Sequence, residues 1–139
     1  MILQPVGSGG GGEAQLLEAQ CLVSDEVGNA VYVSGDKVGD FYQVTTVDIT
    51  DKSKMPAKGV IVEKISTTQC LVRTGGVEED FGAGLTPDER FFVGTDGKLT
   101  STTPSKPISG IKFAQVIAHA VSSQDVLVNL EHPLLLTPS

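Results

Sequence analysis

Tryptophan is absent from this 139-residue sequence, and aromatic residues make up only 5% of it. The apolar residues are therefore mainly aliphatic, as in many small β-barrels and β-sandwiches. Hydrophobic residues account for 40% of the chain and charged residues for 19%, a balance typical of a globular domain rather than a disordered chain. At this length, a single domain buries a substantial core without disulfides or metal ions.

Positive charge is also scarce. The chain contains ten Lys and Arg residues and seventeen Asp and Glu residues, which gives a formal net charge of −7. Phosphate binding needs concentrated positive charge, so we do not expect nucleic acid as the main partner. We interpret the acidity as favouring solubility. No apolar run is long enough to span a membrane, and no basic segment precedes a short apolar one. We therefore expect cytoplasmic synthesis and no membrane partner.

Residues that commonly carry catalysis or bind metals are few. Cys21 and Cys70 both lie in apolar, strand-like runs, which favours reduced, buried side chains over the alternative of a single disulfide. His119 and His132 show neither zinc-ligand spacing nor a nucleophile elbow. The Gly-rich tract at residues 9–12 lacks the Lys-Ser/Thr pair of a phosphate-binding loop. The sequence therefore predicts no enzymatic activity, no catalytic residue, no metal site and no cofactor.

Sixteen Gly and seven Pro residues divide the chain into short segments, many of them rich in Val, Ile and Thr. This pattern predicts an all-β fold: a single compact β-barrel or β-sandwich of short antiparallel strands. Residues 13–20 fit either a turn of helix or a strand. The other expected strands are residues 31–33, 41–49, 60–65, 69–74, 90–93, 98–100, 110–121 with a kink, and 125–130.

Asp96-Gly97 separates two of these strands and has the composition of a hairpin turn. Glycine accepts positive φ without a steric penalty, whereas a β-branched residue does not. We therefore expect Gly97 to have a positive φ in a two-residue or bulged hairpin turn.

We divide the chain into an N-terminal arm at residues 1–12, a β domain at residues 13–130 and an apolar tail at residues 131–139. The tract from Gly7 to Gly12 holds no fixed conformation by itself, yet apolar residues precede it. Such an arm can bind a neighbour by adding a strand to a sheet edge; the alternative is that it has no role. The candidate partner-binding residues are Ile2, Leu3, Pro5, Val6, Leu134, Leu135 and Leu136.

Two pairs of segments in the chain have similar sequences. Residues 59–73 align without a gap on residues 115–129, with six apolar or Ser positions matched. Residues 29–38 and 84–100 also share a strand that ends in an aromatic residue and Val, followed three residues later by Asp. Two explanations remain open at this point: an internal duplication, or chance similarity between β-hairpins that use the same few residue types.

Residues 84–104, with the sequence GLTPDERFFVGTDGKLTSTTP, resemble a sequence motif of tailed-phage virion proteins, in particular capsid decoration (head cement) proteins. In that family "GLTPGxxYFL" precedes "GGLTxxxP", "QxVGxA" and an apolar strand. Residues 28–33 (GNAVYV) are similar to the family's "GDxVYV", and residues 59–62 and 72–77 to its "GVA" and "VxTxGxV". The likeness covers about residues 28 to 130. Asp88 and Ala118 stand where the family commonly has Gly.

The resemblance implies a non-enzymatic virion protein that binds the major capsid protein on the capsid surface, as a homotrimer that stabilises the head. The same module also occurs in phage tail-fibre proteins. The alternative it implies is therefore a fibre or spike module that recognises a glycan on the host surface. A hydrolase domain is a remote alternative, because groups for acid–base catalysis are scarce.

Overall fold

The computed structural model describes residues 15–138 and is nearly all β, with 47% of residues in strands and 3% in helical turns. The expected all-β class is confirmed. Residues 13–20, left open between helix and strand, contain a strand. The only helical element with assigned bounds in the described part is η3 (Lys52–Lys54). The strands are β1 (Leu16–Gln20), β2 (Ala30–Val38), β3 (Phe41–Thr46), β4 (Gly59–Ser66), β5 (Gln69–Arg73), β6 (Gly76–Glu78), β7 (Arg90–Val93), β8 (Leu99–Thr100), β9 (Lys112–Ala114), β10 (Val116–Ala120), β11 (Val126–Val128) and β12 (Leu134–Leu136).

The prediction of a single kinked strand at residues 110–121 is wrong. Residues 110–121 form two strands, β9 and β10, which belong to different sheets and are separated at Gln115. The apolar composition of this run does not reveal the break. At the break, the side chain of Gln115 is buried and binds the backbone of other segments, as described below.

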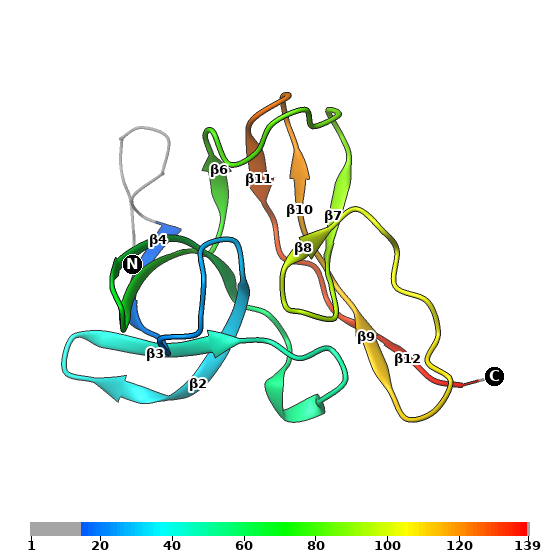
Figure 1. The fold of residues 1–139 in the computed structure, drawn as a ribbon, viewed down its shortest axis with the longest axis horizontal. Helices are drawn as coiled ribbons and strands as arrows, with labels where there is room; N and C mark the ends of the chain where they lie inside the picture. The colour runs from blue at the N-terminus through cyan, green and yellow to red at the C-terminus, as the bar shows by residue number, and fades with distance from the viewer. Residues whose placement is uncertain (1–14, 139) are drawn as a thin grey trace.

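The first five strands form a closed barrel in the order β1-β3-β2-β4-β5, which appears almost as a ring in Figure 1. Four of its five pairings are antiparallel. The fifth pairing closes the barrel: β1 lies parallel to β3, with Ala19 beside Tyr42 and Gln20 beside Gln43. Because its two edges pair with each other, this sheet has no open edge.

The second sheet has the order β6-β11-β10-β7-β8, and a separate two-stranded ribbon joins β12 to β9. In Figure 1 the ribbon extends away from both larger sheets and carries the C-terminus near its end. The tail expected at residues 131–139 is thus partly strand, with Leu134, Leu135 and Leu136 opposite Ala114, Phe113 and Lys112.

The two larger sheets share one strand order. Read in chain order, the first sheet places its strands as 3-2-4-5-1, and the second sheet does the same when β6, β7, β8, β10 and β11 are counted one to five. We call these strand sets the first half and the second half. Equivalent neighbours are antiparallel in both halves. A common order for five strands favours an internal duplication over chance similarity of hairpins.

The hairpin register agrees with the gapless sequence alignment at two residue pairs near the turn. Glu63 lies opposite Leu71 and Lys64 opposite Cys70 in the first half. At positions 56 residues later, His119 lies opposite Leu127 and Ala120 opposite Val126. The strand register does not reproduce the second resemblance, between residues 29–38 and 84–100. Ala30 lies opposite Val60, and Phe92 lies opposite Val116, the position equivalent to Val60. Phe92 therefore corresponds to Ala30, and not to Tyr32 as the sequence pattern suggests.

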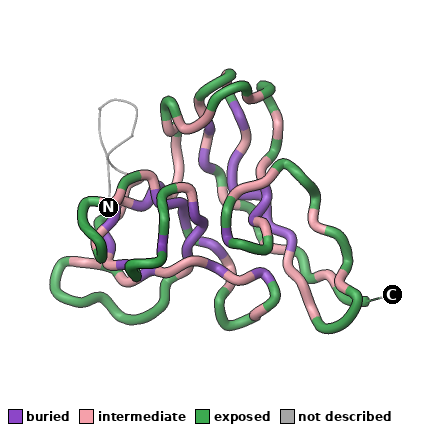
Figure 2. The backbone as a smooth tube through the Cα atoms, in the orientation of Figure 1, coloured by how far each residue is buried: buried purple, intermediate pink, exposed green. Residues whose placement is uncertain are grey.

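Two clusters of buried side chains form the core, shown in purple in Figure 2. One fills the barrel and contains Ala19, Cys21, Val31, Val44, Ile61, Cys70 and Val72. The other combines residues of both halves: Ala30, Val47, Ile49, Ala57, Val60, Val93, Ile117, Ala118, Val126 and Val128. The shared cluster joins the halves into one folded unit.

The turn after β7 connects the halves directly. Gly97 has a φ of +80°, as expected from the sequence, and its N–H donates to the Gly94 carbonyl at 3.0 Å. The Gly94 N–H donates to the Lys98 carbonyl, which gives the bulged form of the turn. The Gly97 carbonyl accepts from Ala30 N–H of the first half at 2.8 Å. Lys98 Nζ adds a 2.6 Å ion pair with Glu26, which lowers the pKa of that carboxyl.

Both cysteines lie in the barrel core as free, buried side chains. Burial raises the pKa of the Cys70 thiol to about 12, and a hydrogen bond with Cys21 contributes. The thiol rather than the thiolate is therefore the form present at neutral pH. This placement confirms the expectation of buried cysteines.

Candidate functional site

A groove of about 810 Å³ runs between the second half and the C-terminal ribbon; we call it the C-terminal groove. Phe92 of β7 and Val116 of β10 are opposite each other in the sheet and are 8% and 7% exposed, so they form a nearly buried floor. The walls come from residues 56–58, from residues 103–104 and from the segment 130–136. Its lining is mainly apolar, as in most ligand-binding pockets.

Gln115 fixes two walls of the groove. Its side chain is 2% exposed, and Oε1 accepts from Ala57 N–H at 2.9 Å. Nε2 donates to the Glu131 carbonyl at 2.9 Å and to the Ala57 carbonyl at 3.3 Å. One buried amide thus holds segments 58 residues and 16 residues away. Sequence reasoning missed this residue; its only signal is a polar residue in the middle of an apolar run.

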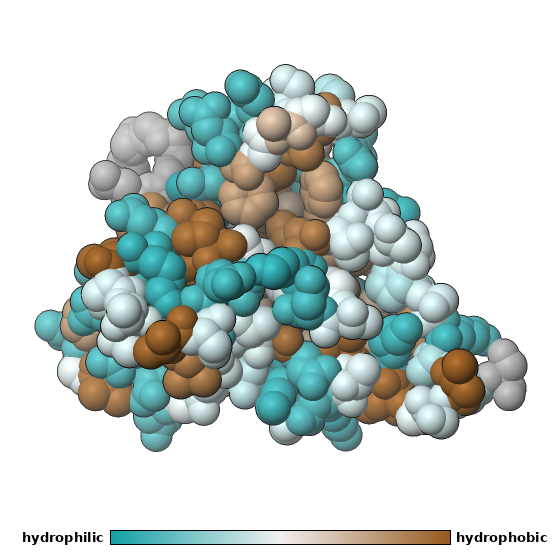
Figure 3. All heavy atoms as spheres, viewed as in Figure 1, coloured by the Kyte–Doolittle hydropathy of each residue, from teal (hydrophilic) through white to brown (hydrophobic). Residues whose placement is uncertain are grey.

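The structure brings one of the two predicted groups of partner-binding residues to this groove. Leu134 and Leu136 line it, whereas Leu135 lies between them on a strand whose side chains alternate in direction. Leu134 is 66% exposed and Leu135 is 56% exposed. Figure 3 shows apolar atoms on the ribbon near the C-terminus. Ile2, Leu3, Pro5 and Val6 lie outside the described residues.

The ribbon also presents backbone groups. Within residues 15–138, β12 pairs only with β9, so its other edge carries unpaired N–H and C=O groups. A partner strand can add to such an edge through main-chain hydrogen bonds, while side-chain pockets supply selectivity. Apolar side chains and an open strand edge at one place are the elements of a protein-docking site.

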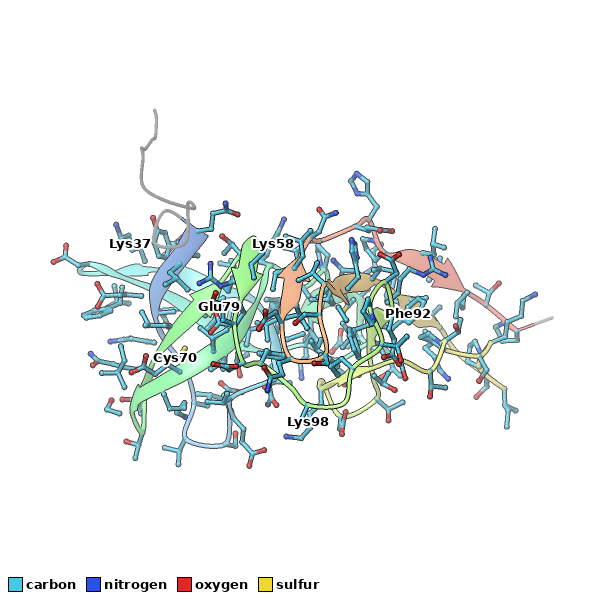
Figure 4. All side chains as sticks on the ribbon, turned by 90° about the horizontal axis from the view of Figure 1, so that it is seen from above. Lys37, Lys58, Cys70, Glu79, Phe92 and Lys98 are labelled. Carbon is cyan, nitrogen blue, oxygen red and sulfur yellow. The ribbon has the colours of Figure 1, made fainter. Side chains whose placement is uncertain are left out.

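Charges border the apolar floor. Lys58 and Arg90 lie on the rim together with Glu131 and His132. The Arg90 guanidinium stands over the Phe92 ring at 5.7 Å from its centre. In Figure 4, Lys58 of the rim lies toward one side of the molecule and Lys98 toward the opposite side. The rim thus carries charges of both signs around an apolar floor.

The histidines lie apart in the fold. His119 is in β10, and its Nδ1 atom is buried with no hydrogen-bond partner in the described structure. His132 lines the groove. No group of three or more His, Cys, Asp and Glu side chains in residues 15–138 is placed to hold a metal ion. None of the helical segments described is both long and apolar enough to cross a membrane.

Comparison of the chain with models of protein families, with curated proteins and with solved structures gives no match.

Proposed function

We propose that this protein is a non-enzymatic virion component that decorates the outside of a phage capsid as a homotrimer and stabilises the head. The observation that carries the proposal is the C-terminal ribbon, where Leu134 and Leu135 stand exposed beside an apolar groove. A subunit that binds only the assembled lattice stabilises it by its binding free energy, and many copies multiply the effect.

Backbone geometry supports the likeness to decoration proteins. Asp88 stands where that family commonly has Gly, and its φ is +72°, in the left-handed region that glycine adopts most readily. The Asp88 N–H donates to the Ala120 carbonyl at 2.8 Å, which places this loop against β10. The family's glycine and this conformation are therefore consistent with each other.

Binding of the ribbon to capsids can be tested with shells assembled from the major capsid protein of the same phage. Wild-type protein is expected to co-sediment with the shells. Leu134→Glu combined with Leu135→Glu should bind at least about tenfold more weakly, because each substitution places a charge in the apolar contact. Val23→Glu is the matched control, since Val23 is 69% exposed and does not line the groove. Failure of the wild type to bind, or equal loss in the control, contradicts the proposal.

The arm at residues 1–12 remains a predicted second contact. Three arms on one trimer gain affinity through effective concentration, although each alone binds weakly because ordering costs about 1–2 kcal/mol per residue. A chain lacking residues 1–12 should keep its fold and trimeric state and lose capsid binding. Full occupancy of capsids by this truncated chain would assign the contact to the ribbon alone.

Glycan recognition by a tail fibre receives less support. Sugar-binding surfaces use exposed aromatic rings, and of the seven aromatic residues, all within the described part, only Tyr42 is exposed. Lys37 Nζ already lies over that ring at 4.9 Å from its centre. Tight binding to a host polysaccharide, or its hydrolysis, would favour the fibre or hydrolase alternatives.

A further inference from the structure

Equivalent positions on the outer faces of the two halves carry different side chains. In the first half, Glu18 and Glu63 lie on either side of Leu71, each directly opposite it in the register. We call Glu18, Leu71 and Glu63 the acidic row. Glu18 and Glu63 are exposed and Leu71 is partly exposed, whereas their neighbours Ala19, Cys70 and Val72 point into the barrel.

The same row in the second half is basic and apolar. Val77 and His119 lie on either side of Leu127, and Arg90 is next to His119. We call Val77, Leu127, His119 and Arg90 the basic row. The alignment places Leu127 over Leu71 and His119 over Glu63, and Val77 pairs with Leu127 as Glu18 pairs with Leu71. Both rows thus have a central leucine, with carboxylates beside one and with His, Arg and Val beside the other.

The charges of each row have no ion-pair partner within the described chain. Two ion pairs occur in residues 15–138, Arg73 with Glu78 and Lys98 with Glu26, and neither involves a charge of these rows. Lys64, next to Glu63, donates to the carbonyls of Leu22 and Asp25. Glu89, next to Arg90, accepts from the Thr86 N–H at 3.2 Å. The nearest charges along the chain are therefore engaged elsewhere.

We propose that the acidic row of one copy packs on the basic row of the next copy. The contact is head-to-tail, because two different surfaces meet, and such contacts generate a closed ring when the rotation closes. Leu71 meets Leu127 at the centre, and the carboxylate on the His119 side of this contact approaches Arg90. The inference rests on the proposed homotrimer and names the surfaces that form it. The shared strand order gives both rows equivalent strand neighbours, while the carboxylates of one row and the Arg90 guanidinium of the other keep like rows apart.

The area of the contact sets what else it includes. A stable interface buries about 800 Å² on each partner, more than one row of side chains provides. The rows are therefore its centre. Val77, 44% exposed, extends the apolar surface at one end of the basic row.

Charge reversal tests the contact, with sedimentation velocity of the free protein as the readout. Wild-type protein should sediment as a trimer. Glu18→Lys with Glu63→Lys should weaken assembly by roughly 100-fold, because like charges then face each other. Asp36→Lys with Asp40→Lys is the control, since both residues are exposed at the β2–β3 turn and the net charge changes equally. Circular dichroism verifies that every variant is folded.

A compensating variant separates charge from misfolding. Adding Arg90→Glu to Glu18→Lys and Glu63→Lys exchanges the signs of the two rows and should restore the trimer. A folded wild type that stays monomeric, a compensating variant that stays monomeric, or equal dissociation of the control each overturns the inference. These outcomes report assembly of the free protein, whereas the ribbon variant at Leu134 and Leu135 reports binding to capsids. A protein that decorates capsids with an intact trimer after reversal at Glu18 and Glu63 keeps the proposed function and loses this interface.

Discussion

The two halves of the molecule share a strand order and differ in how the sheet is closed. In the first half, β1 is five residues long and pairs with both β5 and β3. In the second half, β6 has three residues and β8 has two, and no pairing joins them in the described structure. Backbone hydrogen bonds close the first sheet, and the second stays open.

Side chains cover the opening of the second half. The segment between β6 and β7 brings Phe81 and Leu85 against the shared core, where they line a small cavity of about 140 Å³ with Phe91, Leu99 and Val126. The segment is held by backbone bonds from Gly82 and Leu85 to the Gln124 and Ser123 carbonyls. One strand order thus permits two closures: longer strands close through the backbone, and short strands rely on apolar cover.

The largest expected effect is at the turn that joins the halves. A Cβ atom at Gly97 would meet Thr46 Cγ2 and lie 3.3 Å from the Val47 carbonyl oxygen, at a φ of +80°. Gly97→Val should lower the free energy of unfolding by about 4 kcal/mol, about half from strain and half from overpacking. Chemical denaturation measures it.

Gly84→Val is the matched control for that experiment. Gly84 has a φ of +68°, but a Cβ atom added there would have open space around it, with no neighbouring atom within 4 Å. The free energy of unfolding of this variant should fall by about 1–3 kcal/mol, from backbone strain alone. Equal losses in both variants would show that the contact between the halves contributes nothing at Gly97.

Equivalent core positions in the halves give the next effect. Ile61 and Ile117 correspond in the gapless alignment, and both are 0% exposed. Ile61→Ala and Ile117→Ala should each cost about 3 kcal/mol through the lost burial and the cavity left behind. Because the halves share one buried cluster, calorimetry of both variants should show a single transition. Two separate transitions would mean that the halves unfold independently.

The cover of the second half should matter less. Phe81 is only partly buried, so Phe81→Ala should cost about 1–2 kcal/mol. Hydrogen exchange distinguishes a local effect from a global one: amides of β6 and β8 should exchange faster in the Phe81→Ala variant, and amides of β1 and β3 should not. Uniform acceleration across both halves would contradict the assignment of Phe81 to this opening.

The smallest effect is on reactivity and not on stability. With its pKa raised to about 12, Cys70 is almost wholly in the thiol form at about pH 8. A thiol reagent such as Ellman's should therefore react slowly with the native protein and promptly with two thiols after denaturation. Rapid native reaction at that pH, or an intact mass two protons lower than the reduced chain, would refute a closed barrel with reduced cysteines.

The sequence by itself determined the strand content and much of the local geometry. Val, Ile and Thr runs between turn residues predict most strands, and Asp96-Gly97 predicts a hairpin turn with positive φ at Gly97, because backbone preferences act over a few residues. The hairpin alignment also follows from sequence, since a period of two makes register visible in the apolar pattern.

Tertiary structure decided what is not local. At equivalent positions, the barrel has Gly59, where a Cβ would lie 2.7 Å from the Arg73 carbonyl oxygen, and the second half has Gln115, whose amide binds Ala57 and Glu131. The hydrogen-bond partners of Gln115 come from distant segments, so no local sequence pattern predicts them. Closure of one half and not of the other likewise depends on whether strand edges meet in space. The groove beside Leu134 is likewise assembled from segments far apart in the sequence, with Gln115 between β9, which pairs with β12, and β10.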